Sequence, residues 1–134
     1  ERVRVLKRDG KRLADLNEPP PGDAVWQKLM VYAGEEAEHD GHPLYVQLVR
    51  ALRAAGAAGA TSIRGIWGYH GDHRPHGDSF WQLRRRVPVL TVVVDAPQRT
   101  REWFAVLDEL TARTGLVTSE LVPVVHDPAR PAPR

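Results

Sequence analysis

The chain has no cysteine and little net charge, and each absence removes a class of function. Without cysteine there is no disulfide framework, no thiol nucleophile and no cysteine–zinc site. The formal net charge of +2 is too small to indicate a nucleic-acid partner. No apolar run approaches the roughly 20 residues of a membrane helix, and no stretch has the pattern of a signal peptide. We therefore expect a cytoplasmic protein that neither enters a membrane nor binds nucleic acid.

The side chains that most often carry catalysis are also scarce. No serine lies in a nucleophile-elbow motif, and no pair of carboxylates stands in a context that indicates acid–base chemistry. Asp95 ends an apolar stretch, where an aspartate is expected to cap the following turn. We expect a protein that is not an enzyme.

The apolar pattern is that of one globular domain, with 42% hydrophobic and 27% charged residues in a chain of 134. Short apolar runs predict strands at residues 29–33, 59–68, 87–95 and 116–125. The third of these runs is apolar and rich in β-branched valine, which predicts a central strand buried on both faces. Two helices are predicted from apolar residues at helical spacing: Leu44, Tyr45, Leu48, Val49 and Leu52, then Trp103, Val106, Leu107 and Leu110.

The order of these elements is strand, helix, strand, strand, helix, strand over residues 28–126. It predicts an α+β, ferredoxin-like βαββαβ domain with a four-stranded antiparallel sheet and two helices on one face. The proline-rich residues 127–134 are expected to form a disordered tail.

The connection between the second and third strands, within residues 64–88, is unusually long and polar. Connections of this length without structure of their own are often functional. Its glycines, Gly65 and Gly68 among them, allow backbone N–H groups to approach a ligand, and Arg64 and Arg74 could bind phosphate or carboxylate. Solvated turns are the alternative. Arg84, Arg85 and Arg86 are interpreted as a solvated loop end.

Histidines in the same connection raise the alternative of a metal site. His70, His73 and His76 are spaced by three residues, and imidazole binds zinc, nickel or copper. In a glycine-rich loop this spacing fixes no geometry, so a loop that merely titrates near neutral pH is the competing interpretation.

An ordered set of short motifs resembles a known family. The motifs are Gly34-Glu35, Gly41, "PLY" at residues 43–45, "GAT" at 59–61, "RGI" at 64–66, Gly68, and Pro88 at the start of the third strand. They resemble the PII-like family of domains of unknown function that is number one-ninety in its series. The resemblance covers residues 28–126 and implies the fold of PII signalling and divalent-cation tolerance proteins, which are trimers with ligand clefts between subunits.

For this chain the resemblance implies a signalling role. Residues 69–86 would correspond to the mobile T-loop of PII proteins and would contact a partner protein, and a fluoride-channel-type membrane protein is the partner that the family's context implies. Arg74 and His76 fit an Arg-x-His pattern of this loop, and Arg113, Thr114 and Gly115 resemble the start of the second nucleotide-binding loop. The expected ligand is a nucleotide or another small anion. A trimer that binds a divalent metal and a ligand-free accessory of an ion channel remain alternatives.

Residues 1–27 lie before the predicted domain. They contain a strand pattern followed by an Asp-Gly turn at Asp9 and Gly10. The spacing of Glu1, Val3 and Val5 matches that of Glu120, Val122 and Val124, which suggests the tail of a preceding copy of the domain, with residues 17–23 as a linker. The alternative is an extension that pairs with a sheet edge.

Overall fold

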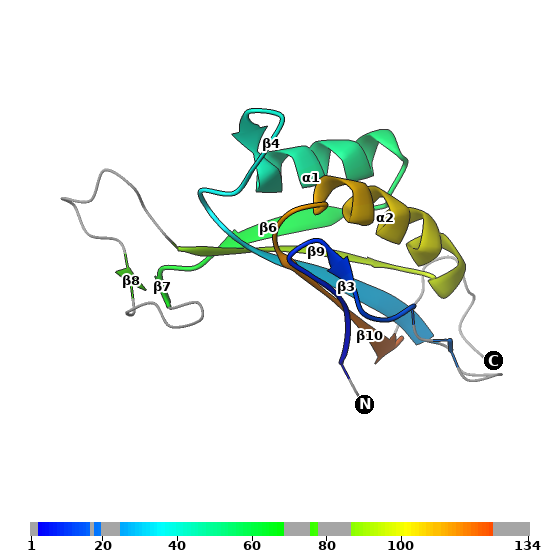
Figure 1. The fold of residues 1–134 in the computed structure, drawn as a ribbon. Coiled ribbons are helices and arrows are strands. Elements are labelled where there is room, and N and C mark those ends of the chain that lie inside the picture. Colours follow the sequence, from blue (N-terminus) through cyan, green and yellow to red (C-terminus); the bar gives the residue numbers. More distant parts are fainter. Residues whose placement is uncertain (1–2, 17, 20–24, 69–75, 78–86, 125–134) are drawn as a thin grey trace.

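The fold is a six-stranded antiparallel sheet with two helices packed on one of its faces (Figure 1). The structure, a computed structural model, describes residues 3–16, 18–19, 25–68, 76–77 and 87–124. The elements in chain order are β1 (Arg4–Arg8), β2 (Lys11–Arg12), β3 (Val25–Gly34), β4 (Glu38–His39), β5 (His42–Pro43), α1 (Leu44–Ala54), β6 (Ala60–Arg64), β7 (Trp67–Gly68), β8 (His76–Gly77), β9 (Pro88–Asp95), α2 (Pro97–Leu110) and β10 (Leu116–Pro123).

The predicted α+β class is confirmed, but the predicted strand number is wrong. The sheet has the order β2-β1-β10-β3-β9-β6, so six strands replace the expected four. The two additional strands come from the N-terminal residues, because β1 pairs antiparallel with the outer edge of β10. Leu6 of β1 is fully buried in the same core as the helices. An edge strand with unpaired backbone groups and a nearby apolar surface explains why this segment adds to the sheet.

Both helices begin at a proline and bury one apolar face. Pro43 precedes the first turn of α1, and Pro97 occupies the first turn of α2, where the missing N–H of proline costs no hydrogen bond. The buried face of α1 consists of Leu44, Leu48 and Leu52. The buried face of α2 consists of Thr100, Trp103, Phe104 and Leu107. These faces meet the side chains of Leu29, Val31, Val93 and Val117 from the sheet.

The other face of the sheet is only half covered. Along β9, buried residues alternate with half-buried ones, so the prediction that this strand is buried on both faces is wrong. Helices lie on one face only, and the side chains that alternate away from them have no second layer above them in the described part of the chain. We call this side the open sheet face. Its central members, as the strand register aligns them, are Ile63, Leu90, Tyr32 and Leu116 in one row, and Thr61, Val92, Met30 and Thr118 in the next.

Two further observations concern the chain's boundaries. Among the described residues, no helix has the length and apolar character needed to cross a bilayer. The predicted tail at residues 127–134 and most of the predicted linker at residues 17–23 lie outside the described residues.

Candidate functional site

The predicted ligand residues gather at one end of the sheet. At this end β6 and β3 finish, and β9 and β10 begin, because neighbouring strands are antiparallel. Arg64 is the last residue of β6, and Gly65 follows it directly. Gly115 directly precedes β10 and lies beside Tyr32 near the end of β3. Two segments far apart in the sequence therefore share one end of the molecule.

Arg64 is held by a carboxylate of its own chain. Its Nε donates to Oε1 of Glu35 at 2.9 Å, and its second guanidinium nitrogen donates to Oε2 at 3.0 Å. The side chains are 33% and 24% exposed, so this two-point pair is partly shielded from water. An anion that uses Arg64 must share the guanidinium with Glu35.

Gly65 is packed against the neighbouring strand. Its amide donates to the carbonyl of Pro88 at 2.7 Å. A Cβ at this position would lie 3.0 Å from Cγ of Pro88 and 3.1 Å from its carbonyl oxygen. The need for glycine here therefore follows from the close approach of two strands.

Gly68 and His76 come together across the start of the long connection. β7 and β8 form a two-stranded antiparallel pair in which Gly68 lies opposite His76, and Trp67 lies opposite Gly77. The sequence predicted both Gly68 and His76 as ligand residues without indicating that they are neighbours. Ile66, directly before β7, and Trp67 within it are the most exposed large hydrophobic residues that the structure describes, at 77% and 70%.

The second predicted segment is the loop between α2 and β10. Gly115 has φ +95°, which L side chains rarely adopt, and a Cβ there would approach the carbonyl oxygen of Tyr32 to 3.2 Å. Thr114 is half buried and Arg113 is exposed. Within the described residues Arg113 has no ion pair, so its guanidinium is available to an anion.

The two segments are at the same end of the sheet but not in contact. Strands β9 and β3 lie between β6 and β10. At a spacing of about 4.8 Å between neighbouring strands, the two segments are about 14 Å apart. The backbones of the two segments are therefore not neighbours within one chain.

Other predicted site residues cannot be placed. Arg74, His70 and His73 lie outside the described residues, as does most of the predicted partner loop at residues 69–86. Within the described ranges, no three histidine, aspartate or glutamate side chains come close enough to hold a metal ion. The metal hypothesis therefore stays a prediction about the segment that contains His70 and His73.

One neighbour of the site could not be found from sequence. The turn at Asp9 and Gly10 lies on the loop at residues 112–115: the amide of Asp9 donates to the carbonyl of Gly115 at 2.8 Å. A Cβ on Gly10 would approach the carbonyl oxygen of Ala112 to 2.2 Å. The Asp-Gly turn itself was visible in the sequence, but its contact with a loop near the other end of the chain was not.

The family comparison supports the resemblance drawn from the short motifs. The family model DUF190, described as Uncharacterized ACR, COG1993, matches residues 26–124. The chain belongs to the DUF190 family. This is a PII-like family of unknown function, so the predicted membership is confirmed. No curated protein matches the chain. The DUF190 match includes both predicted ligand segments, whereas the β1–β2 hairpin lies outside it.

Proposed function

We propose that this DUF190 chain is a PII-like regulatory protein rather than an enzyme. It forms a trimer, binds a small anionic ligand between subunits, and transmits ligand occupancy to a partner protein through residues 69–86. The observation that favours this function most is the arrangement of Arg64 and Arg113. Both lie at one end of the sheet, on segments that strands β9 and β3 separate within a chain. A cleft between two chains can bring an Arg64 segment and an Arg113 segment together.

The open sheet face supports self-association. Ile63 and Tyr32 are 55% and 37% exposed, and Leu90, Val92 and Leu116 are half buried on the same face. Thr118 is 4% exposed, but its hydroxyl has no hydrogen-bond partner among the described residues. A largely apolar face is more stable when a second copy covers it, and a polar group of that copy would supply the hydrogen bond that the Thr118 hydroxyl lacks. The order β10-β3-β9-β6 of four of the six strands is the order expected of a ferredoxin-like domain, which the proposal assigns to this chain.

The chemistry of the two segments favours phosphate or carboxylate. Arg113 is unpaired within the described residues, and the guanidinium of Arg64 is already oriented by Glu35. Planar guanidinium groups bind such anions through two parallel hydrogen bonds. The proposed ligand therefore stays a nucleotide or another small anion that carries phosphate or carboxylate groups.

The start of the long connection supports a partner-binding role. Ile66 and Trp67 are exposed directly before residues 69–86. Exposed isoleucine and tryptophan side chains are typical anchors of protein interfaces. A cytoplasmic surface of a fluoride-channel-type membrane protein is the partner we propose for them.

Native mass spectrometry combined with calorimetry tests this function. The purified chain is expected to be a trimer at micromolar concentration and to bind ATP, ADP or inorganic pyrophosphate. Arg113→Gln should weaken that binding about tenfold if its charged hydrogen bonds are partly buried. Arg50→Gln, an exposed cation on α1, should have less than about a twofold effect.

Three results would contradict the proposal or part of it. A monomer at these concentrations would exclude the intersubunit cleft. A trimer that binds no anion would leave a structural role only. Tight zinc or nickel binding that is lost in His70→Ala/His73→Ala, with no anion bound, would replace the anion by a metal.

A further inference from the structure

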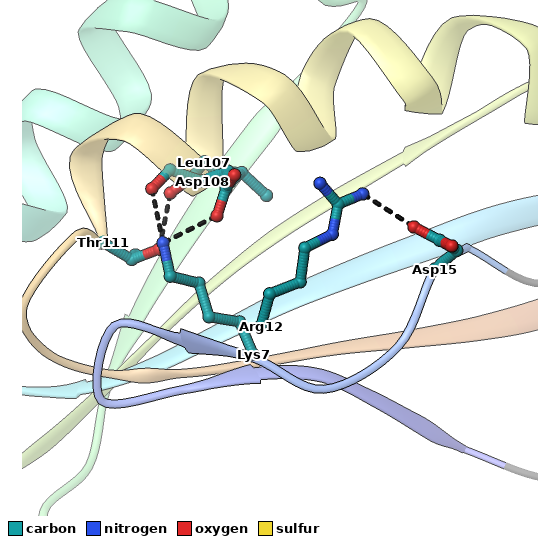
Figure 2. Close-up of polar contacts among 6 residues, drawn as sticks. All are labelled: Lys7, Arg12, Asp15, Leu107, Asp108 and Thr111. Carbon is teal, nitrogen blue, oxygen red and sulfur yellow. Dashed lines mark hydrogen bonds and ion pairs between the residues drawn. The ribbon is translucent and has the colours of Figure 1, made fainter.

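The inner side of the β1–β2 hairpin has its positive charges neutralised. Lys7 and Arg12 lie opposite each other in the register, and both side chains reach toward the α2 side of the sheet (Figure 2). Nζ of Lys7 donates to Oδ1 and to the carbonyl oxygen of Asp108, both at 2.6 Å. Arg12 donates to Oδ1 of Asp15 at 2.8 Å and lies over the ring of Phe104, 5.0 Å from its centroid. These contacts, with fully buried Leu6, hold the hairpin firmly on the domain.

The outer side of the same hairpin has no such neutralisation. Arg8 and Lys11 are the next pair in the register, and alternation along the strands directs them away from α2. Both are exposed, and neither has a hydrogen bond or an ion pair within the part of the chain that the structure describes. Like charges directly opposite each other in a hairpin are destabilising. An anion that bridges Arg8 and Lys11 would remove this repulsion.

A third cation, Arg113, belongs to the loop on which the turn of this hairpin packs. The hairpin turn packs on residues 112–115, where Asp9 bonds to Gly115 and a Cβ on Gly10 would lie 3.4 Å from Cα of Arg113. Arg113 is exposed and has no ion pair within the described ranges. Asp9 is the carboxylate of the same turn. The turn that joins Arg8 to Lys11 therefore packs on the backbone of Arg113, so three cations and the Asp9 carboxylate come from two adjoining segments.

We propose that Arg8, Lys11 and Arg113 form a binding site for a diphosphate group, whether free or part of a nucleotide. A group with two or more negative charges can contact both members of the Arg8–Lys11 pair and Arg113 at once, whereas a monoanion cannot neutralise them all. The inference rests on the proposed function, because Arg113 belongs to both. It adds two residues of a hairpin that lies outside the family match.

Calorimetric titration of inorganic pyrophosphate into the full chain tests the site. Arg8→Gln/Lys11→Gln is expected to weaken binding about fivefold to thirtyfold, since each exposed ionic contact contributes modestly. Asp9→Asn removes the repelling charge and is expected to tighten binding about twofold to fivefold. Asparagine also tolerates the positive φ of 46° at this position. Arg50→Gln/Arg53→Gln on α1 is the matched control, because it removes the same charge from exposed positions elsewhere.

The outcomes separate this inference from the proposed function. If pyrophosphate or ATP binds, Arg113→Gln weakens it, and Arg8→Gln/Lys11→Gln does not, the hairpin site is excluded while the proposed function stands. Equal losses for the hairpin variant and the α1 control would indicate general charge attraction and would also exclude the site. If the wild-type chain binds neither pyrophosphate nor a nucleotide, both the site and the anion part of the proposed function are wrong. Unchanged thermal unfolding of each variant confirms that the hairpin remains folded.

Discussion

The indole nitrogen of Trp103 donates a hydrogen bond of 3.0 Å to Oδ2 of Asp95, a carboxylate that is almost fully buried at the start of α2. Oδ1 of the same carboxylate accepts from the amide of Ala96 at 2.8 Å. Arg99 lies 3.8 Å from Oδ2 and over the Trp103 ring. Asp95 thus joins the end of β9 to α2, as expected of a residue that caps the following turn, and its acceptors are occupied by the protein itself.

Asp95→Ala should lower the free energy of unfolding by about 2–3 kcal/mol, because a buried indole N–H and a partly buried amide lose their acceptor. Asp95→Asn should cost roughly half as much, because one carbonyl oxygen remains. Urea unfolding monitored by tryptophan fluorescence measures both. Asp15→Ala, with an exposed carboxylate, is the control and should cost less than about 0.5 kcal/mol. Equal losses at Asp95 and Asp15 would contradict the proposed role of Asp95.

Gly10→Ala should destabilise the chain by at least about 2 kcal/mol. Alanine would have to accept a φ of +80° and would place its Cβ 2.2 Å from the carbonyl oxygen of Ala112. Gly41→Ala provides the matched control, because Gly41 has φ +74° but nothing lies within 4 Å of its Cβ position. Its cost should be only about 1 kcal/mol from backbone strain. If the denaturant midpoints of both variants shift equally, the hairpin turn does not pack closely against the loop before β10.

The interaction free energy between Arg64 and Glu35 should be about 1–2 kcal/mol in a double-mutant cycle. It makes two parallel hydrogen bonds with partly shielded side chains, which places it between a surface pair and a buried pair. A double-mutant cycle with Arg64→Gln and Glu35→Gln, read by chemical unfolding, gives the coupling directly. The same cycle on Arg12 and Asp15, whose side chains are 54% and 87% exposed, should give less than about 0.5 kcal/mol. A coupling at Arg64 no larger than that would mean that Glu35 holds the guanidinium no more firmly than Asp15 holds that of Arg12.

Local patterns in the sequence were sufficient for most elements of the domain. Leucines at helical spacing after Pro43 predicted α1, and the apolar stripe around Trp103 predicted α2, because periodic burial appears in consecutive residues. The strand at Leu6 was visible as a strand and a turn. Pairing with a sheet edge was one of the two alternatives for this segment. The partner strand β10 and the register were not predictable, because register between segments far apart in the chain leaves no local signal.

The sequence predicted which residues belong to the candidate site, but it did not predict how those residues are arranged. Arg64 and Gly115 were identified as ligand residues, and both lie at one end of the sheet. The pairing of Arg64 with Glu35 depends on the order of the strands, and so does the separation of the Arg64 and Gly115 segments by strands β9 and β3. Composition and short motifs do not predict that order. The sequence likewise did not predict that Arg8 and Lys11 lie opposite each other without an ion pair among the described residues, because this depends on the register of the hairpin.

The open sheet face offers the most direct test of assembly. Ile63 lies on edge strand β6 and continues the row formed by Leu90 and Tyr32. If a second copy covers this row, a glutamate at position 63 must be buried without a partner, which is costly. In a chain that stays monomeric, the same glutamate would be solvated, since Ile63 is more than half exposed.

Ile63→Glu should therefore weaken self-association at least about tenfold while leaving the unfolding midpoint of the isolated chain nearly unchanged. Sedimentation velocity across a range of concentrations measures the shift from trimer toward monomer. Ala105→Glu adds the same charge at an exposed position on α2, on the covered side of the sheet, and should leave the distribution of species as in the wild type. A trimer that persists in Ile63→Glu would mean that the copies meet elsewhere, and the cleft between Arg64 and Arg113 of neighbouring chains would lose its basis.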